Sequence, residues 1–310
     1  MTSRAVQYRR FGGPEVLEVV EREDPSPASG QVRLAVRAAG VNPLDWKLRR
    51  GLMSSDDAPP EPRVPGFDVA GVVEELGEGV TSVAVGDEVL GSAIGGSYAE
   101  RALAKADTLV AKPGALDWPT AAAVVTGLTT AYRALALVGL GEGDHTGSTL
   151  VVDGASGGVG TMVVQLAVSR GVTVIGTAGQ ARQDEVRALG ATPTVYGEGL
   201  VERVRELAPQ GVDAALDLAG KGSLPDLVAL TGSADRVVTI ADGSAAEHGV
   251  TFSSGGPGQG VPGALADGVA RLADGRLRAP TVHTYTLDEA GRAQDDNESG
   301  RVPGKLVLVM

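Results

Sequence analysis

The stretch Thr149-Leu-Val-Val-Asp-Gly-Ala-Ser-Gly-Gly-Val-Gly160 decides the fold of this chain. Residues 149–153 are mostly apolar and β-branched, a pattern that predicts a buried strand. Small residues follow, including Gly157 and Gly160, and apolar residues then recur at helical spacing from Val159 to Ala167. A strand, a glycine-rich turn and a helix in this order present backbone N–H groups and a positive helix end to a pyrophosphate. The sequence therefore predicts a dinucleotide site.

Strand and helix patterns alternate after this turn. Strands are predicted at Val172–Gly176, Thr194–Tyr196, Val212–Leu218 and Arg236–Ala241, and helices at Gln180–Leu189, Glu198–Leu207 and Ser223–Leu230. A longer helix, Ala121–Leu137, precedes the turn. This alternation is typical of an α/β domain with a doubly wound parallel sheet.

The first 117 residues show a different sequence pattern. Glycine and proline turn signals recur at short intervals, and they separate short segments such as Gln31–Arg37 and Val69–Val73. Many short strands between such turns predict a compact, β-rich, barrel-like domain. Ser54–Pro62 is a polar, proline-rich loop.

The last 60 residues are expected to return to that first domain. Phe252–Gly263 is predicted as a glycine-rich loop, and 264–273 as a helix. A strand at Thr281–Thr286, an acidic stretch at Gln294–Glu298 and a final strand at Lys305–Val309 follow.

Composition excludes several classes of protein. The chain has 310 residues, no cysteine and a net charge of −12, so disulfides and thiolate metal sites are absent, and nucleic acids and anionic membranes are poor partners. No apolar run reaches the roughly 18 residues needed to span a bilayer, and the N-terminus lacks the apolar core of a secretory signal. We expect a cytoplasmic protein of one or two domains.

The end of the second strand indicates which dinucleotide binds. NAD-binding domains place an acidic residue there, about 20 residues after the glycines, to bind the ribose 2′-hydroxyl. Here Val174–Arg182 contains no Asp or Glu, and the first acid is Asp184. Thr177 and Arg182 would accept a 2′-phosphate, although Arg182 could equally be a solvated helix residue. We therefore predict NADP(H). Asp153, at the mouth of the turn, is expected to cap it.

The chain resembles the zinc-free medium-chain dehydrogenase/reductases, in particular the quinone oxidoreductase group, over essentially its whole length. The matching segments are Val41–Asp45, Pro65–Val73, Val85–Val89, Gly96–Glu100, Ala121–Ala131, Gly154–Gly160, Leu189–Ala191 and Ser299–Lys305. The resemblance implies a GroES-like substrate domain (residues 1–120 plus 262–310) around a Rossmann domain (121–261). It also implies NADPH and a homodimer, formed through an edge strand near 236–256.

The chemistry expected from this resemblance needs no metal. Without cysteine, and with only three scattered histidines, neither a structural nor a catalytic zinc site can be built. Hydride addition to a quinone or to an α,β-unsaturated carbonyl, in the cleft between domains, remains open because the cofactor carries the difficult step. Two alternatives are a specialised enoyl or tailoring reductase of a biosynthetic pathway and a non-catalytic NADPH-binding relative.

The resemblance assigns roles on both sides of the site. Asn42 and Asp45 match the active-site turn near the nicotinamide ribose and substrate. The segment Trp46–Leu48 departs from some family members, which have tyrosines there; Lys47 could donate a hydrogen bond to the developing oxyanion, although a solvated lysine is the favoured interpretation. Lys305 matches a closing Gly-Lys motif, but its position before a strand favours a surface lysine. Trp46 could stack on a flat acceptor or lie in the core.

The cofactor contacts expected from the resemblance form four groups. Thr126 and Thr130 would lie on the nicotinamide side, although helix packing explains them equally well. Ser156, Gly157, Gly158 and Val159 would meet the pyrophosphate. Thr177, Arg182 and Tyr196 would face the adenosine and its 2′-phosphate, and Ala219, Gly220, Ile240 and Ala241 would line the ribose and nicotinamide at the carboxyl ends of strands.

Overall fold

The chain divides into two compact units. A computed structural model describes residues 1–59, 61–255 and 259–310. Unit 1 comprises Met1–Thr126 and Leu265–Met310, and unit 2 comprises Gly127–Ala264. The predicted domain boundaries, after residues 120 and 261, lie a few residues before these. Part of the two predicted loops, Ser54–Pro62 and Phe252–Gly263, falls on residues 60 and 256–258, outside the described residues.

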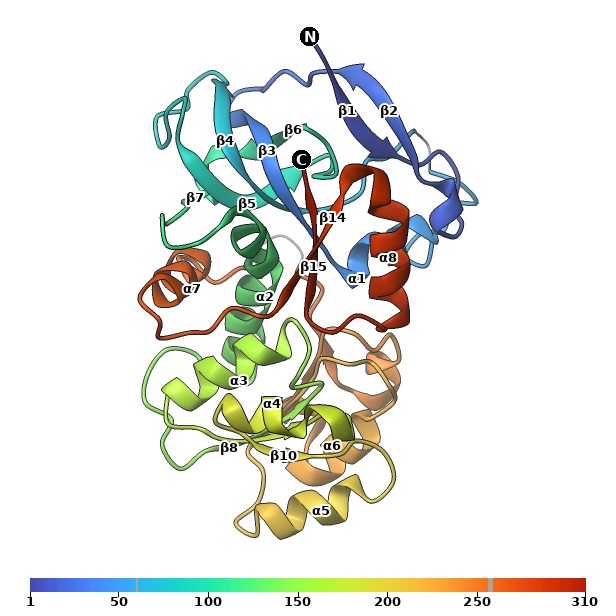
Figure 1. Cartoon of the computed structure of the whole chain (residues 1–310). Coiled ribbons are helices and arrows are strands. Elements are labelled where there is room, and N and C mark those ends of the chain that lie inside the picture. The colour runs from blue at the N-terminus through green and yellow to red at the C-terminus, as the bar shows by residue number, and fades with distance from the viewer. Residues whose placement is uncertain (60, 256–258) are drawn as a thin grey trace. The chain divides into compact units, whose positions relative to one another are not determined.

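Unit 1 is built on antiparallel strands that close into a barrel. Its strands are β1 (Thr2–Gln7), β2 (Glu18–Glu23), β3 (Gln31–Val41), β4 (Asp68–Leu76), β5 (Glu88–Ile94), β6 (Arg101–Lys105), β7 (Val110–Ala111), β14 (Val282–Thr286) and β15 (Lys305–Val309). The main sheet runs β14-β15-β3-β4-β5-β6, and an additional pairing of β3 with β6 closes the barrel (Figure 1). Alternating apolar residues of β3 and β4 fill its core, including Leu34, Val36, Val69 and Val73.

The C-terminal segments belong to unit 1, as the sequence predicted. β15 pairs antiparallel with β3 and parallel with β14. Two helices, α1 (Pro43–Arg49) and α8 (Ala290–Ser299), contact each other, and α7 spans Ala264–Ala273. The acidic stretch at Gln294–Glu298 therefore lies in a helix that the sequence analysis missed. Its acids are partly buried: Glu298 pairs with the buried Arg49, and Asp296 accepts a 3.0 Å hydrogen bond from the Tyr285 hydroxyl. Ala290, Ala293 and Gln294 are buried.

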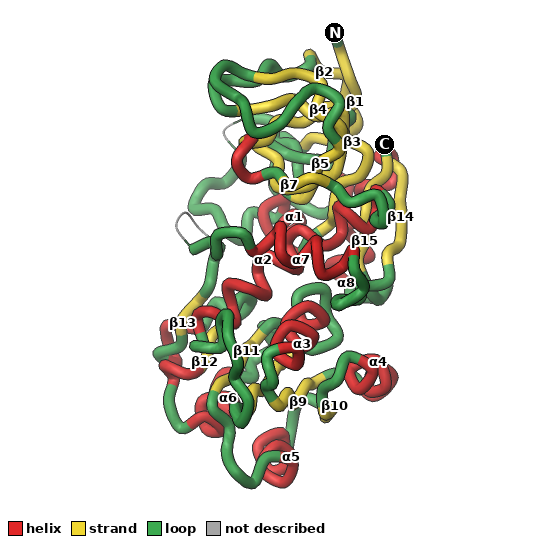
Figure 2. The backbone as a smooth tube through the Cα atoms, turned by 90° about the vertical axis from the view of Figure 1, so that its left-hand side faces the viewer, coloured by secondary structure: helices red, strands yellow, loops and turns green. Residues whose placement is uncertain are grey.

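Unit 2 is the predicted doubly wound domain. Its strands are β8 (Thr149–Asp153), β9 (Thr173–Thr177), β10 (Thr192–Thr194), β11 (Ala214–Asp217), β12 (Val237–Thr239) and β13 (Thr251–Phe252). They form one parallel sheet in the order β10-β9-β8-β11-β12-β13. Its helices are α3 (Gly160–Ser169), α4 (Gln183–Ala188), α5 (Leu200–Leu207) and α6 (Leu224–Thr231) (Figure 2). The strand predicted at Thr194–Tyr196 lies two residues earlier.

Helix α2 (Trp118–Leu137) is long and apolar enough, by length and composition alone, to cross a membrane. The expectation that no run reaches this length is therefore wrong. The helix is 67% buried over its most apolar window, and a helix that is apolar all round is typical of a protein core. We interpret α2 as a core helix.

Candidate functional site

The glycine turn of unit 2 leaves backbone donors free. It lies between β8 and α3, at the carboxyl end of the sheet's central strands. The N–H groups of Ser156, Gly158 and Val159 have no hydrogen-bond acceptor within the described chain. The first N–H groups of a helix always lack internal partners, and together with the helix dipole they attract an anion. The predicted residues 156–159 are thus gathered as a turn that fits a pyrophosphate.

Gly160 sets the shape of this turn. A Cβ at this position would lie 2.2 Å from the carbonyl oxygen of Gly154 and 2.8 Å from the carbonyl carbon of Ala155. No side chain fits at such a distance, so only glycine allows α3 to begin this close to the end of β8. Gly154 itself has a φ of +85°, in the region that glycine adopts without strain.

Asp153 does not cap the turn directly, contrary to the expectation. Its carboxylate is buried and accepts hydrogen bonds from the hydroxyl groups of Thr177 and Ser223, the latter at 2.7 Å. Thr177 in turn accepts a 3.1 Å hydrogen bond from the N–H of Gly154. Asp153 therefore supports the turn through Thr177. Because Thr177 is fully buried and its hydroxyl is engaged, its placement does not support the predicted contact with adenosine.

A second buried carboxylate, which the sequence analysis missed, faces Asp153 across the sheet. Asp217 pairs with Asp153 in the register of β11 and β8. It accepts hydrogen bonds from the N–H groups of Ala219 (3.0 Å) and Gly220 (2.8 Å) and from the Thr239 hydroxyl (2.7 Å). Burial raises the pKa of Asp217, and the nearby Asp153 adds to the increase. Asp217 thereby fixes the turn that carries two predicted contact residues.

Hydrogen bonds also hold the residues that follow β12. Ile240 follows β12 and donates its N–H to the carbonyl of Asp217 at 3.0 Å, and the N–H of Ala241 bonds to the Thr239 hydroxyl at 3.0 Å. Ala241 also lies against Gly220, where a Cβ would come within 2.7 Å of its carbonyl oxygen. The four residues predicted to line the ribose and nicotinamide are thus gathered at the carboxyl ends of β11 and β12.

Residues 178–182, which follow β9, include Arg182 and contain no acidic residue. Arg182 is partly buried and donates a hydrogen bond to the carbonyl of Ser156 at 3.3 Å, which places its side chain against the glycine turn. Tyr196 is 63% exposed, and its hydroxyl lies 3.9 Å from the Cβ position of Gly179. The structure therefore brings Arg182 and Tyr196 to the same segment, 178–182, that follows β9.

In unit 1, a buried polar network surrounds Asn42. Its amide donates to Asp68 at 2.9 Å, and its side-chain oxygen accepts from the Lys305 ammonium at 2.5 Å. The Thr126 hydroxyl donates to the other Asp68 oxygen at 2.6 Å. Lys305 is only 7% exposed, so the interpretation as a surface lysine is wrong. Lys305 and Asp68 hold the Asn42 amide in one orientation.

Asp45 joins the network at the first turn of α1. One carboxylate oxygen accepts hydrogen bonds from the N–H of Asn42 at 2.8 Å and from the Tyr98 hydroxyl at 2.9 Å. This oxygen closes the helix N-terminus, as an acid at the third position does in a capping box. The other oxygen, Oδ1, is buried and lacks a hydrogen-bond partner among the described residues.

The network contains two buried carboxylates and one buried cation. Burial raises the pKa of Asp45 to about 7, and the Asp68 charge adds to the increase, while hydrogen bonds from Asn42 and Tyr98 and the charge of Lys305 oppose it. Burial also raises the pKa of Asp68 and lowers that of Lys305. Since one ammonium compensates one carboxylate, the second carboxyl holds its proton up to neutral pH. Asp45 is therefore able to give or take a proton near pH 7.

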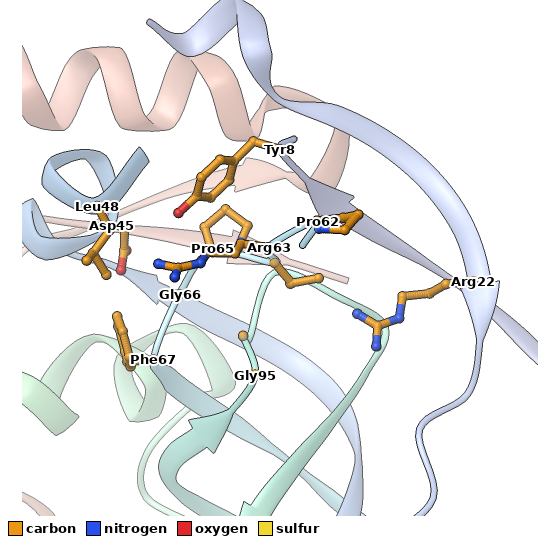
Figure 3. Close-up of a pocket in the computed structure, with 12 residues that line it drawn as sticks. Tyr8, Arg22, Asp45, Leu48, Pro62, Arg63, Pro65, Gly66, Phe67 and Gly95 are labelled. Carbon is orange, nitrogen blue, oxygen red and sulfur yellow. The ribbon is translucent and has the colours of Figure 1, made fainter. Parts of the chain in front are cut away.

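Asp45 also lines a cavity of about 350 Å³ that lies entirely within unit 1 (Figure 3). Its walls come from the end of β1, from β2, from α1 and from the segments 62–67 and 95–96. Leu48 and Phe67 provide apolar surface, and Tyr8, Arg22 and Arg63 provide polar groups. This size is within the range of pockets for small ligands.

Three other predicted residues lie outside this cavity. Lys47 does not line it, and its ammonium lies 5.8 Å from the centroid of the Trp46 ring. Trp46 is partly buried, and its indole N–H has no partner in the described chain. Thr130, in unit 2, is buried and accepts a 3.4 Å hydrogen bond from Arg133.

The residues that the sequence analysis missed gave weak signals. Asp68 is the first residue of one apolar strand and Asp217 is the last residue of another, where a charge is unusual unless it is paired. Tyr98 lies inside a segment that matched the family, but no role was assigned to it. Asp68 and Tyr98 bond to residues at least 26 positions away, whereas Asp217 bonds to the backbone of the following turn and to Thr239 on the next strand, and no periodicity identifies such contacts.

Comparisons with known proteins agree with this architecture. Residues 28–114 match the alcohol dehydrogenase GroES-like domain, and residues 158–255 match the domain described as zinc-binding dehydrogenase. The quinone oxidoreductase of Lama guanicoe is 32% identical over 99% of this chain and 97% of its own length.

Solved structures show the same relationship. The quinone oxidoreductase from Coxiella burnetii has a TM-score of 0.84 and 28% identity, with both chains fully covered. Mycobacterial Rv1454c, solved in complex with NADPH, has a TM-score of 0.83 and 26% identity, with 99% of this chain and 100% of that chain covered. Together with the fold and the glycine turn, these similarities show that the chain belongs to the quinone oxidoreductase family of medium-chain dehydrogenase/reductases.

Proposed function

We propose that the protein reduces a quinone, or the double bond of an α,β-unsaturated carbonyl, with NADPH. The observation that carries the proposal is the glycine turn, because three backbone N–H groups are free at the start of α3, at the carboxyl edge of a doubly wound sheet. The quinone oxidoreductases to which the chain is similar support the choice of acceptor.

The preference for NADPH over NADH rests on charge. Residues 178–182, which directly follow β9, contain no carboxylate that would repel a 2′-phosphate, and Arg182 lies there with the exposed Tyr196. A guanidinium pairs well with phosphate oxygens. The NADPH complex of a structural relative supports this choice.

The bound cofactor supplies the hydride, and the residues of this chain supply position and a proton. Ser156, Gly158 and Val159 would hold the pyrophosphate through their N–H groups. Asn42, held by Lys305 and Asp68, would orient the reacting groups through a rigid amide. Asp45, whose pKa is raised to about 7, would deliver the proton that completes reduction. The hydrogen bond predicted for Lys47 stays a prediction.

We further propose that the reaction is independent of zinc, since the sequence contains no cysteine and the described residues contain no cluster of three potential metal-binding side chains. A quinone is already polarised enough to accept a hydride without a Lewis acid.

We also propose a cytoplasmic homodimer. β13, at the edge of the unit 2 sheet, lies within the segment 236–256 expected to form the interface; light scattering of the purified protein measures its mass.

Oxidation of NADPH, followed with a panel of uncharged quinones and enones, tests the proposed reaction. Turnover of simple quinones supports it. Turnover confined to a large enone would favour a specialised biosynthetic reductase, and tight NADPH binding without turnover of any acceptor would favour a non-catalytic relative.

The cofactor preference has its own test. Arg182→Ala should weaken NADPH binding about tenfold and leave NADH binding unchanged, because one charge-assisted contact with the 2′-phosphate is lost. Arg187→Ala is the matched control, since Arg187 lies on the same segment but is exposed and pairs with Asp184. Equal affinities of the wild type for both nucleotides would contradict the preference.

A further inference from the structure

The cavity of unit 1 is positively charged in a strongly acidic protein. The chain has a net charge of −12, yet Arg22 and Arg63 both line this cavity. Neither forms an ion pair within the described residues. Asp45 is the acid in the lining, and its carboxylate is already bonded to Asn42 and Tyr98. The two guanidinium groups are therefore not neutralised by the protein.

Arg63 is exposed, but its backbone is held in place. Its backbone forms a two-way bridge with Tyr8, with N···O distances of 2.9 Å in both directions. Burial raises the pKa of the Tyr8 phenol, and the nearby positive charge of the Arg63 guanidinium opposes this increase. Figure 3 shows this guanidinium directed towards the Tyr8 hydroxyl and Asp45, whereas Arg22 lies at the other end of the cavity.

Other residues that line the cavity are apolar. Leu48, Pro65 and Phe67 line the cavity beside Asp45, and Phe67 is 38% exposed. An aliphatic and aromatic wall of this kind fits one or two rings. The cavity thus has an apolar wall, the carboxyl group of Asp45, and two guanidinium groups that form no ion pair among the described residues. These features suit a ligand whose ring contacts the apolar wall and whose acidic substituent pairs with a guanidinium group.

We propose that this cavity binds an electron acceptor that carries an anionic substituent, a carboxylate or sulfonate on its ring, and that Arg63 pairs with this substituent. Arg22 contributes a second, more distant positive charge, and the apolar ring lies against Leu48 and Phe67. The inference rests on the proposed function, because it names the class of acceptor that the reductase selects. A positively lined cavity in an acidic protein also concentrates anions locally, which favours their capture.

Two acceptors that differ by one charge test the proposal: 1,2-naphthoquinone and 1,2-naphthoquinone-4-sulfonate. The selectivity, defined as kcat/KM for the sulfonate divided by kcat/KM for the uncharged quinone, should fall roughly five- to tenfold in Arg63→Gln. Comparing variants with the wild type removes the intrinsic difference in reactivity of the two quinones. Arg22→Gln should lower the selectivity less, and mainly at low salt.

Arg37→Gln is the matched control. Arg37 lies on β3 of the same unit, is exposed and does not line the cavity, so its loss changes the net charge equally and should leave the selectivity unchanged. An unchanged selectivity in Arg63→Gln, or an equal fall in Arg37→Gln, would overturn the proposal. Failure of the wild type to reduce even the uncharged quinone would instead overturn the proposed function.

A measurement on the wild type tests the proposal without relying on a folded Arg63 variant. 1-Naphthoate and 1-naphthamide have the same shape and differ in charge. Naphthoate should compete with the uncharged quinone at least fivefold better than naphthamide, and the difference should shrink as salt screens the guanidinium groups. Equal inhibition by the two compounds would contradict the proposal even if every Arg63 variant were unstable.

Discussion

Each unit buries two carboxylates, but the groups that bond to these carboxylates differ between the units. In unit 1, Asp45 and Asp68 share a buried network with the ammonium of Lys305. In unit 2, Asp153 and Asp217 face each other across adjacent strands, and among the described residues only hydroxyl and backbone N–H groups bond to them. The first arrangement depends on charge and gives one carboxyl a pKa near neutrality. The second depends on geometry and fixes two turns that a ligand would contact.

The largest effect should come from removing the cation of unit 1. Lys305→Met leaves two buried carboxylates without a compensating charge, and we expect the free energy of unfolding at pH 8 to fall by about 3–5 kcal/mol. The loss should be smaller at pH 5, where protonated carboxyls carry no charge. Denaturant unfolding at both pH values measures it, with Lys47→Met as the control for a lost lysine. A loss below about 1 kcal/mol at pH 8 would show that Lys305 does not balance the network.

Unit 2 should instead respond to a change of shape. In Gly160→Ala the added methyl group would lie 2.2 Å from the carbonyl of Gly154, so the start of α3 must shift and the free N–H groups must move. Overpacking of this kind costs about 1–3 kcal/mol, which corresponds to a roughly ten- to hundredfold loss of NADPH affinity. Calorimetric titration measures it. Gly260→Ala, where nothing lies within 4 Å, should bind NADPH like the wild type.

The pH dependence of stability separates the two networks further. The pKa of Asp45 is raised from 3.8 to about 7 in the folded protein, so between these values the folded state binds more protons than the unfolded state. Stability should therefore decrease as pH rises from about 4 to 7, by at most about 1.4 kcal/mol per pH unit.

Asp45→Asn should remove this contribution to the slope, and unfolding curves at pH 4, 5.5, 7 and 8 measure it. Activity provides an independent check, because a proton donor with this pKa becomes ionised above pH 7. The wild-type kcat should then fall while the Asn variant shows a low, flat profile. The same slope in both proteins would exclude Asp45 as its source.

The smallest effect is expected from a charge change in unit 2. Asp153→Asn keeps an acceptor for Thr177 and offers an amide to Ser223, and it removes the repulsion with Asp217. We expect the free energy of unfolding at pH 8 to change by less than about 1 kcal/mol. A loss comparable to that of Lys305→Met would mean that unit 2 also depends on charge, and the distinction between the units would fail.

The sequence predicted those features that local patterns determine. Residues 149–160 identified the strand, the turn and the helix, and the missing acid after Val174–Thr177 was visible directly. Lys305 was interpreted as a surface residue because its partner, Asn42, is 263 positions away. Asp217 gave only a weak signal, as an acid at the end of an apolar strand. Whether a charge is buried depends on contacts between distant segments, and no periodicity records them. The helix at Ala290–Ser299 was missed because it is mostly polar and has too few apolar residues to show a helical repeat.

The return of β15 to β3 has a consequence for synthesis of the protein. Unit 2 is formed by one continuous segment, 127–264, and can fold as soon as that segment leaves the ribosome. Unit 1 must wait, since β3 pairs with β15 and Lys305 reaches Asn42 only after residues 305–309 are made. A nascent chain that stops before residue 305 would carry the glycine turn but not the complete network around Asn42. The network of unit 1 is thus completed only after the whole of unit 2 has been translated.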